Sequence, residues 1–386
     1  MLSKESNCER RVLLIAGIDA VGIARLPKLF AKAGFQVTLL GSTGLAAASS
    51  RFVSKLIPCG KSPDAAAAAA REHLARNRAD YELIIVADEA TFWAAVDQQP
   101  HDWIQGWFPI PVNPESLERE GSKIRFLLDA RAAGIETPRF EICSSEPELR
   151  MAVDKIGCPV YLKANRGQSG SGIFFAKTFE ELERHIGEMS FSEPVVAQQE
   201  IVGDTVSISV LYDHGKPLCW FGYIMRDMWP TRFASASSVE FYWSPAVDTM
   251  VEGIGKLTEF NGLAGIDCML EAGTGRLPLL EFNPRPTPVY HLGPHVGVDF
   301  AKAIRGIGSA MPAQRPDGTV KKTIRMFPQS LYHSFEQHDP SKFLDALADA
   351  PWDDPRLVAA QLRRVATHYA SPEAKACFKR MFRRER

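Results

Sequence analysis

Apolar runs alternate with helical patterns in the first third of the chain. The runs at residues 11–17, 35–41 and 81–88 are continuous and are typical of buried strands. Helical patterns lie between them, and the sequence Ser62-Pro63-Asp64 before an alanine run is a good helix start. Ser can cap a helix, Pro tolerates its first position, and Asp favours the positive end of its dipole. This order predicts an α/β unit with a parallel sheet.

A second pattern follows three prolines between Pro109 and Pro114, which exclude a helix interior and mark a boundary. After the boundary, helical spacing ends at Gly134, and two strands then enclose a glycine-rich loop, which predicts a hairpin. The elements predicted here are helices at 146–156, 179–188 and 247–260 and strands at 159–164, 173–177, 195–199, 205–213, 217–225, 265–270 and 277–283.

Three oxygen-bearing side chains are predicted to converge on the last of these hairpins. If Thr274 is the centre of its glycine-rich turn, Asp267 lies directly opposite Glu281, and Asn283 shares their face because side chains alternate along a strand. Like charges placed opposite each other destabilise a sheet, and Mg²⁺ with phosphate oxygens would offset the repulsion. The alternative is a solvated polar face whose carboxylates pair with Lys or Arg.

Lys163 lies in the otherwise apolar strand 159–164, just before the glycine-rich loop from Gly167 to Gly172. An unpaired ammonium in that setting would be costly, and a phosphate partner would remove the cost. Backbone amides of the loop could approach the same phosphates, because glycine has no side chain to keep them apart. The alternative is an edge lysine whose ammonium reaches solvent.

Charge and composition narrow the function classes. Lys and Arg number 45 against 46 Asp and Glu, and the net charge of -1 provides no basic field for nucleic acid. No apolar run approaches the ~20 residues of a membrane helix, and the N-terminus has no signal-peptide pattern. We therefore expect no membrane partner and a cytoplasmic location. The seven cysteines form no CxxC pair, which argues against a disulfide framework or a zinc site.

Two other motifs are interpreted as structural. Residues 17–22 lie where a dinucleotide fingerprint would, but Asp19 replaces its middle glycine, and we expect Asp19 to cap the first helix. The crevice there could still bind a different small ligand. His291 and His295 are four residues apart, yet Gly293 and Pro294 between them exclude the helical face of a metal-binding pair.

The order of these features resembles the ATP-grasp superfamily. Lys123 on a helix, Lys163 before the glycine loop, the sequence QQEIVGDT, Asp267 and the sequence EFNPR follow the superfamily's order between residues 112 and 292. The resemblance implies an α/β N-terminal domain followed by a two-lobed α+β ATP-grasp fold. The segments it implies are the α/β domain at 1–111, the two lobes at 112–190 and 191–308, and a mostly helical segment at 309–386.

In this resemblance ATP lies between the lobes, with Lys123 and Lys163 on its phosphates and Arg285 facing the transferred phosphoryl group. Arg285 and Lys163 would then be the catalytic residues. The metal ligands implied for Mg²⁺, or Mn²⁺ in its place, are Asp267, Glu281 and Asn283. The other nucleotide contacts implied are Gly167, Ser169, Gly170, Ser171, Gly172, Gln198, Gln199, Ile201 and Thr205.

Ribose binding departs from the usual pattern. Thr205 occupies the position where the superfamily normally has a ribose-binding glutamate, and the adjacent Asp204 is expected to point to the opposite face of the strand. If the ribose contact is misplaced here, Glu200 and Asp204 are the first residues to consider.

The resemblance implies a carboxylate-amine ligase that forms an acyl phosphate and ADP, followed by an amide or peptide bond. The sequence around EFNPRP looks closest to the branch with carbamoyl-phosphate synthase and amino-acid ligases. The expected partners are a small carboxylate and an amine, with an amino acid among them, and a homodimer is an assembly to test. Arg226 and Arg232 are candidates to hold the carboxylate, and ordinary ion pairs are the alternative for each.

Two rival functions remain open. Bicarbonate could be the phosphoryl acceptor, which would make the protein a carboxylase or a carbamoylating enzyme. A nonenzymatic nucleotide-binding regulatory protein is the second rival, and the full set of Lys, Asp, Glu, Asn and Arg residues disfavours it.

Overall fold

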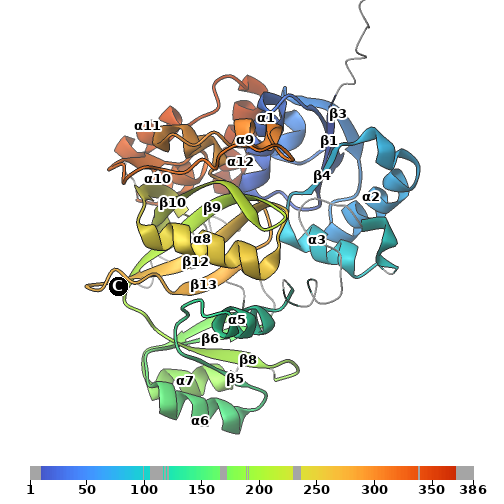
Figure 1. Ribbon diagram of the computed structural model, residues 1–386. Coiled ribbons are helices and arrows are strands. Elements are labelled where there is room, and N and C mark those ends of the chain that lie inside the picture. The colour runs from blue at the N-terminus through green and yellow to red at the C-terminus, as the bar shows by residue number, and fades with distance from the viewer. Residues whose placement is uncertain are drawn as a thin grey trace, which may run out of the picture.

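The computed structural model describes residues 10–98, 100–104, 116, 119, 121–165, 172–187, 189, 191–228, 236–337 and 340–370 (Figure 1). These residues form three sheets. A parallel sheet near the N-terminus and a small antiparallel sheet lie at two ends, and a larger antiparallel sheet lies between them. The boundary predicted between Pro109 and Pro114 falls outside the described residues, and the four predicted segments stay predictions.

The N-terminal unit is a parallel sheet, as the sequence pattern predicts, and its strand order is β3-β2-β1-β4. Its central strand is buried from Val12 to Ala16, as expected where helices cover both faces. The strands are β1 (Arg11–Ala16), β2 (Gln36–Gly41), β3 (Val53–Pro58) and β4 (Leu83–Val86). The helices are η1 (Val21–Arg25), α1 (Leu26–Lys32), η2 (Ala46–Ser49), α2 (Pro63–Asn77), η3 (Arg78–Asp80), α3 (Glu89–Val96) and η4 (His101–Ile104).

Two local predictions in this unit have different outcomes. The start of α2 is confirmed, because the Ser62 hydroxyl accepts a hydrogen bond from the Ala65 amide at 3.1 Å. The prediction that Asp19 caps the first helix is wrong, because η1 has Ala20 at its N-cap without a side-chain bond. Asp19 instead accepts from the Ala46 amide at 3.1 Å, at the start of η2, and pairs with Arg364. Contacts with later segments therefore outweigh the local cap.

The small antiparallel sheet has the order β5-β8-β6-β7, and α6 and α7 pack against it. The predicted hairpin around the glycine-rich loop is confirmed by the pairing of Lys163 with Ile173. The strands are β5 (Phe140–Cys143), β6 (Val160–Ala164), β7 (Ile173–Ala176) and β8 (Val195–Gln199). The helices are α5 (Lys123–Ala132), α6 (Glu146–Ile156) and α7 (Phe179–Ile186).

The larger sheet has the order β13-β12-β9-β10-β11-β14 and carries helices on both faces. Side chains of α8 pack on one face, and Phe300 of α9 packs on the other together with Phe30 of the N-terminal unit. The strands are β9 (Gly203–Asp213), β10 (Lys216–Met228), β11 (Ala236–Tyr242), β12 (Gly262–Glu271), β13 (Leu279–Asn283) and β14 (Thr323–Arg325). The helices are α8 (Pro245–Thr258), η5 (Tyr290–Val296) and α9 (Phe300–Arg305).

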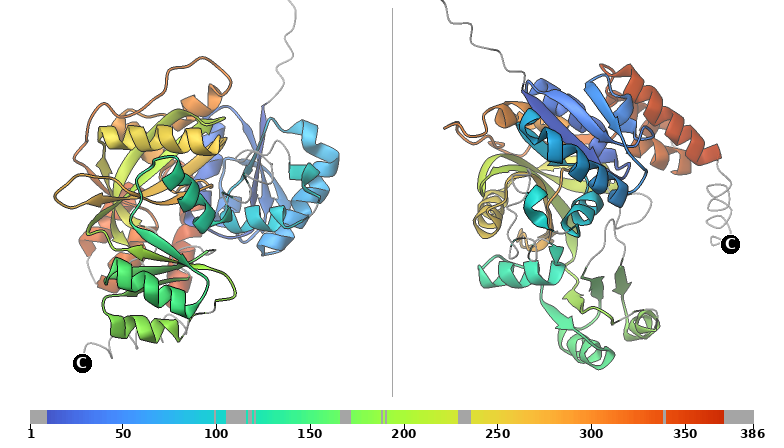
Figure 2. Two further views of the ribbon diagram at one scale, coloured as in Figure 1. Left: turned by 60° about the horizontal axis from the view of Figure 1, so that its bottom comes forward. Right: turned by 90° about the vertical axis from the view of Figure 1, so that its right-hand side faces the viewer.

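The last described elements are α10 (Gln329–Gln337), α11 (Pro340–Ala348) and α12 (Pro355–Ala370) (Figure 2). α10 and α11 lie against β11 and β14 of the larger sheet, and α12 lies beside the N-terminal unit. Leu357 of α12 packs on Ala24 and Ala46. No helix within the described ranges is long and apolar enough to cross a bilayer.

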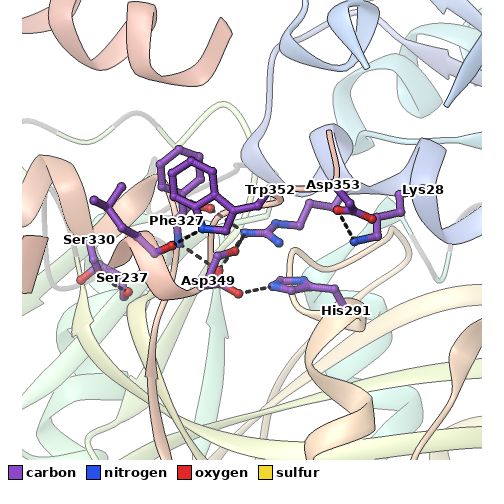
Figure 3. A network of polar contacts seen from close by, with 10 residues as sticks. Lys28, Ser237, His291, Phe327, Ser330, Asp349, Trp352 and Asp353 are labelled. Carbon is purple, nitrogen blue, oxygen red and sulfur yellow. Dashed lines mark hydrogen bonds and ion pairs between the residues drawn. The ribbon is translucent and has the colours of Figure 1, made fainter. Parts of the chain in front are cut away.

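A buried polar cluster of Arg25, His291, Phe327 and Asp349, which we call the Asp349 clasp, joins four distant segments (Figure 3). The Asp349 carboxylate accepts hydrogen bonds from Arg25 at 2.8 Å and from the Phe327 amide at 3.0 Å, and it lies 2.9 Å from Nε2 of His291. The side chain of Asp349 is only 7% exposed. The clasp therefore ties η1 of the N-terminal unit, η5 and Phe327 to the loop that follows α11.

Candidate active site

The hairpin of β12 and β13 has the predicted register. Asp267 pairs with Glu281 and Gly265 pairs with Asn283, as expected for a turn centred on Thr274. A register shift follows directly, so that Cys268 pairs with Leu279. The irregularity lies between the turn and the site, and it leaves the facing carboxylates in place.

The two facing carboxylates are stabilised in different ways. Asp267 accepts a hydrogen bond from Nδ2 of Asn283 at 2.9 Å, and Lys123 of α5 lies 2.9 Å from Oε1 of Glu281. Burial raises the pKa of Asp267, and the charge of Glu281 raises it further, against the hydrogen bonds from Ser207 and Asn283. The ion pair between Lys123 and Glu281 thus offsets part of the predicted repulsion between Asp267 and Glu281.

Lys163 is an interior residue of its sheet, because β6 lies between β8 and β7. Burial lowers the pKa of its ammonium to about 8, and the charge of Lys123 lowers it as well, while Glu281 and Asp267 oppose the shift. The alternative placed Lys163 on an edge strand, and that part of it is wrong. Lys163 is a half-buried cation that lines the cavity near the carboxylates of the hairpin.

These groups line a cavity of about 440 Å³. The segment with the sequence QQEIVGDT, which runs from the end of β8 to the start of β9, lines the same cavity. The cavity lies between the small and the larger antiparallel sheets, whose strands β6, β8, β9, β12 and β13 supply much of its lining. The predicted residues that line it are Lys123, Lys163, Gln198, Gln199, Ile201, Thr205, Asp267, Glu281, Asn283 and Arg285.

Most of the glycine-rich loop lies outside the described residues. Gly167, Ser169, Gly170 and Ser171 lie outside the described residues. Gly172 is described, and its carbonyl accepts a hydrogen bond from the Ala164 amide at 2.9 Å, which closes the β6–β7 hairpin.

Gln198 has an unsatisfied donor at the other end of the cavity. The residue is 1% exposed, and its Nε2 has no hydrogen-bond partner among the described residues. A buried amide without a partner is costly, so this group favours a ligand that can accept a hydrogen bond. The neighbouring Gln199 side chain is already used, because its Oε1 accepts from Arg139 at 3.1 Å.

Acidic and basic residues near Thr205 are mostly paired with each other. Arg226 donates to Asp204 at 2.5 Å and to Glu240 at 3.1 Å, so the ion-pair alternative holds for Arg226 in the ligand-free protein. Thr205 and Glu200 line the cavity. The other arginine proposed for a carboxylate, Arg232, lies outside the described residues.

Sequence reasoning missed Glu89, which reaches the cavity from α3 of the N-terminal unit. Its Oε2 lies 3.6 Å from Nε of Arg285, and its Oε1 accepts from Nε1 of Trp93 at 3.4 Å. Burial raises the pKa of Glu89, and the charge of Arg285 opposes this. A usable signal existed, because Asp88 and Glu89 directly follow a buried parallel strand, where α/β sheets bind ligands.

The segment after Arg285 is fixed by buried hydroxyl groups. Ser209 and Thr287 share a hydrogen bond of 2.6 Å, and the hydroxyl of Tyr290 accepts from the Thr287 amide at 3.1 Å. The same hydroxyl donates to the Ala264 carbonyl at 3.2 Å. Arg285 therefore lies on a backbone that β9 and β12 hold in place.

Comparison with known proteins gives matches in the same region. Residues 121–289 match the ATP-grasp domain family. A D-alanine–D-alanine ligase of Xylella fastidiosa is 27% identical over 179 residues, which are 42% of this chain and 56% of that ligase. The chain thus spans little more than half the length of this relative.

Solved structures agree over a larger part of the fold. An N5-carboxyaminoimidazole ribonucleotide synthetase in complex with ADP has a TM-score of 0.65 at 12% identity, over 86% of this chain and 85% of that one. An L-amino acid ligase from Bacillus licheniformis has a TM-score of 0.54 at 16% identity, over 78% and 74%. Residues 121–289 therefore match the ATP-grasp domain family, the chain has the fold of these solved structures, and a parallel-sheet α/β unit precedes the matched residues.

Proposed function

We propose that this protein is an ATP-dependent carboxylate-amine ligase that acts through an acyl phosphate. The observation that carries the proposal is the convergence of Lys123, Lys163 and Arg285 on the paired carboxylates Asp267 and Glu281 within one cavity. Phosphoryl transfer needs positioning and positive charge more than covalent help, and this set supplies both.

The nucleotide is proposed to lie along the cavity with its base near Gln198 and its phosphates near the two lysines. The unsatisfied Nε2 of Gln198 suits the ring nitrogens of a purine, which accept hydrogen bonds. Main-chain groups of Gln199 and Ile201 are proposed as further base contacts. The ribose is proposed to contact Thr205, with Glu200 as the other candidate, because Asp204 is held by Arg226.

The hairpin residues fit a magnesium ion. Asp267, Glu281 and the amide oxygen of Asn283 are oxygen donors, and the burial and repulsion that raise the pKa of Asp267 would be relieved by a divalent cation. Mg²⁺ is usually held by one or two protein carboxylates, with water and nucleotide phosphates in its other positions, and the hairpin supplies two carboxylates. Bound Mg²⁺ would neutralise charge on the nucleotide phosphates, and Mn²⁺ is the expected substitute.

In the proposed reaction, a carboxylate oxygen of the acid attacks the γ-phosphorus, and the bond from that phosphorus to the ADP oxygen breaks. Lys163 and Arg285 hold the transferred phosphoryl group. An amine nitrogen then attacks the acyl carbon, inorganic phosphate leaves, and the nitrogen loses its proton as the amide forms. Water must be excluded between these steps, since it would hydrolyse the acyl phosphate.

The proposal is tested by measuring ADP release from ATP and Mg²⁺ with pairs drawn from a panel of small acids and amino acids. We expect ADP and inorganic phosphate with at least one acid-amine pair, and loss of turnover in Lys163→Met. The matched control is Lys177→Met, at the exposed end of the same hairpin, which should keep activity.

Three results would contradict the proposal. Release of AMP and pyrophosphate would show an adenylating enzyme, ADP release with bicarbonate alone would favour the carboxylase rival, and ATP binding without turnover on any pair would favour the regulatory rival. The homodimer and the cytoplasmic location stay predictions.

A further inference from the structure

We propose that Glu89 of the N-terminal α/β unit binds the ammonium group of the amine substrate. This inference rests on the proposed ligase function and assigns one of its substrates to a residue outside the ATP-grasp domain. Glu89 is the first residue of α3 and lines the same cavity as the phosphate-facing lysines.

The position of Glu89 is set by a buried anchor at the end of β1. Asp88 caps α3 by accepting from the Thr91 amide at 2.8 Å, and its other oxygen accepts from the Gly17 amide at 3.0 Å. Gly17 is needed there, because a Cβ at this position would lie 2.5 Å from the Thr91 hydroxyl. The first turn of α3 is therefore held rigidly against β1, and Glu89 is directed into the cavity.

One oxygen of Glu89 is held and the other is available. Oε1 accepts from Trp93, whereas Oε2 lies 3.6 Å from the Arg285 guanidinium. That separation exceeds the roughly 2.8 Å of a good charge-assisted hydrogen bond. The Glu89 side chain is only 20% exposed, and the Arg285 guanidinium is too far for a good hydrogen bond. Oε2 of Glu89 could therefore bind a second cation that lies closer.

The other carboxylates that line the cavity have proposed roles toward the nucleotide or its metal ion, and Glu89 does not. Asp267 and Glu281 belong to the proposed metal site, and Glu200 lies on the QQEIVGDT segment at the other end. Glu89 is the remaining carboxylate of the described lining, and it lies at the end where Arg285 would contact the phosphoryl group. A bare carboxylate beside phosphate oxygens would be repelled, so a further cation at this end, besides Arg285 and Lys123, would be stabilising.

The ammonium of an amine substrate would be such a cation. It would donate to Oε2 of Glu89, and this carboxylate would take up one of its protons as the nitrogen attacks the carbon of the acyl phosphate. The competing explanation is purely structural: a negative residue in the first turn of a helix is favoured by the helix dipole, and Arg285 is then its permanent partner.

Hydroxylamine separates the two explanations, because it is an uncharged nucleophile at neutral pH and needs no ammonium-binding carboxylate. The experiment compares wild type with Glu89→Gln, in which the amide oxygen can still accept from Trp93. Two rates are measured with the same acid, ATP and Mg²⁺: hydroxamate formation with hydroxylamine, and amide formation with the amine found in the panel. Glu72→Gln, on the exposed surface of α2, is the matched control.

We expect Glu89→Gln to raise the KM for the amine about 10- to 100-fold, as for the loss of one charge-assisted hydrogen bond, while hydroxamate formation changes less than about twofold. An unchanged thermal melting temperature would show that α3 remains folded.

Equal loss of both reactions would overturn the inference and show that Glu89 only positions Arg285. An unchanged KM for the amine would overturn it too. Failure of the proposed function gives a different result, since wild type itself would then form no hydroxamate with any acid, and the inference would fall with it.

Discussion

At the scale of single residues, the candidate site combines paired charges, such as Lys123 with Glu281, with polar groups whose burial is costly, such as Lys163 and Gln198. Lys163 lies inside a sheet, where burial lowers the pKa of its ammonium to about 8. A phosphate would favour the charged form of this lysine, which burial disfavours. Burial is also costly for the uncharged amide of Gln198, whose Nε2 has no hydrogen-bond partner among the described residues.

We predict that nucleotide binding takes up protons near pH 8. The phosphates bind the ammonium form of Lys163, so ADP affinity should be full below pH 8 and should weaken as the pH rises through that value. At pH 8 roughly half a proton should be taken up per nucleotide, since the group is half-protonated at its pKa. Calorimetric titrations in two buffers of different ionisation enthalpy measure this uptake.

Lys163→Met, if it still binds ADP, should show no such proton uptake, and Lys177→Met should behave as wild type. A wild-type binding enthalpy that does not depend on the buffer at pH 8 would contradict the prediction.

Site residues that face each other on one hairpin could be predicted from the sequence. Site residues that are brought together from two different units could not. Asp267 and Glu281 are 14 positions apart around a glycine-rich turn, so alternation and register were enough to pair them. Glu89 and Arg285 are nearly two hundred positions apart, and only the packing of α3 against the ATP-grasp domain brings them together. Local patterns contain no information about such a contact.

At the scale of elements, the β12–β13 hairpin places the carboxylates of Asp267 and Glu281 opposite each other, and their repulsion is unfavourable for strand pairing. Its neighbour β9 begins at Gly203, which lets the two strands approach closely, because a Cβ there would overlap the Leu270 carbonyl. The glycine of the QQEIVGDT motif thus has a packing role beside the cavity. The edge strand β3 was missed in the sequence because residues 53–58 are only partly buried and lack a continuous apolar run.

We predict that Glu281→Gln changes the stability of the ligand-free protein by less than about 1 kcal/mol, because the lost attraction to Lys123 and the relieved repulsion from Asp267 oppose each other. Turnover should fall at least about 100-fold, as expected when charge stabilisation of the transition state is removed. Urea unfolding and the ADP-release assay measure the two effects.

Glu271→Gln, near the turn of the same hairpin, is the control and should keep activity. A loss of more than about 2 kcal/mol of stability in Glu281→Gln would instead mean that the ion pair with Lys123 is chiefly structural.

At the scale of the whole molecule, the Asp349 clasp connects the C-terminal helices to the two units that form the site (Figure 3). Burial acts to raise the pKa of Asp349, but the hydrogen bond with His291 and the charge of Arg25 outweigh it, so the pKa lies below its usual value. His291 lies in the segment that follows Arg285, so the clasp also secures the turn that contains Arg285. The helical segment from which sequence reasoning drew no chemistry thus has a structural function.

We predict that the clasp makes stability depend on pH through His291. Burial and the nearby Arg25 lower the pKa of His291 to about 4 from its ordinary 6.5, so the unfolded chain binds more protons between these values. The stabilisation is full above pH 6.5 and is lost as the pH falls toward 4, by up to about 3 kcal/mol. Urea unfolding across this range measures the loss.

In His291→Gln, which keeps a donor for Asp349 but cannot titrate, the free energy of unfolding should fall less steeply over the same window. His214→Gln, at an exposed histidine, is the control and should follow wild type. Parallel pH profiles for wild type and His291→Gln would contradict this role of the clasp.

The central claim, an acyl phosphate formed at this site, is tested most directly by following oxygen from the acid. The acid identified in the panel is labelled with ¹⁸O in both carboxylate oxygens and allowed to react with ATP, Mg²⁺ and the amine until product has formed. We predict one ¹⁸O in the inorganic phosphate for each amide bond made, since the attacking carboxylate oxygen leaves with the phosphoryl group. Label in AMP, or unlabelled phosphate accompanied by amide, would contradict the claim.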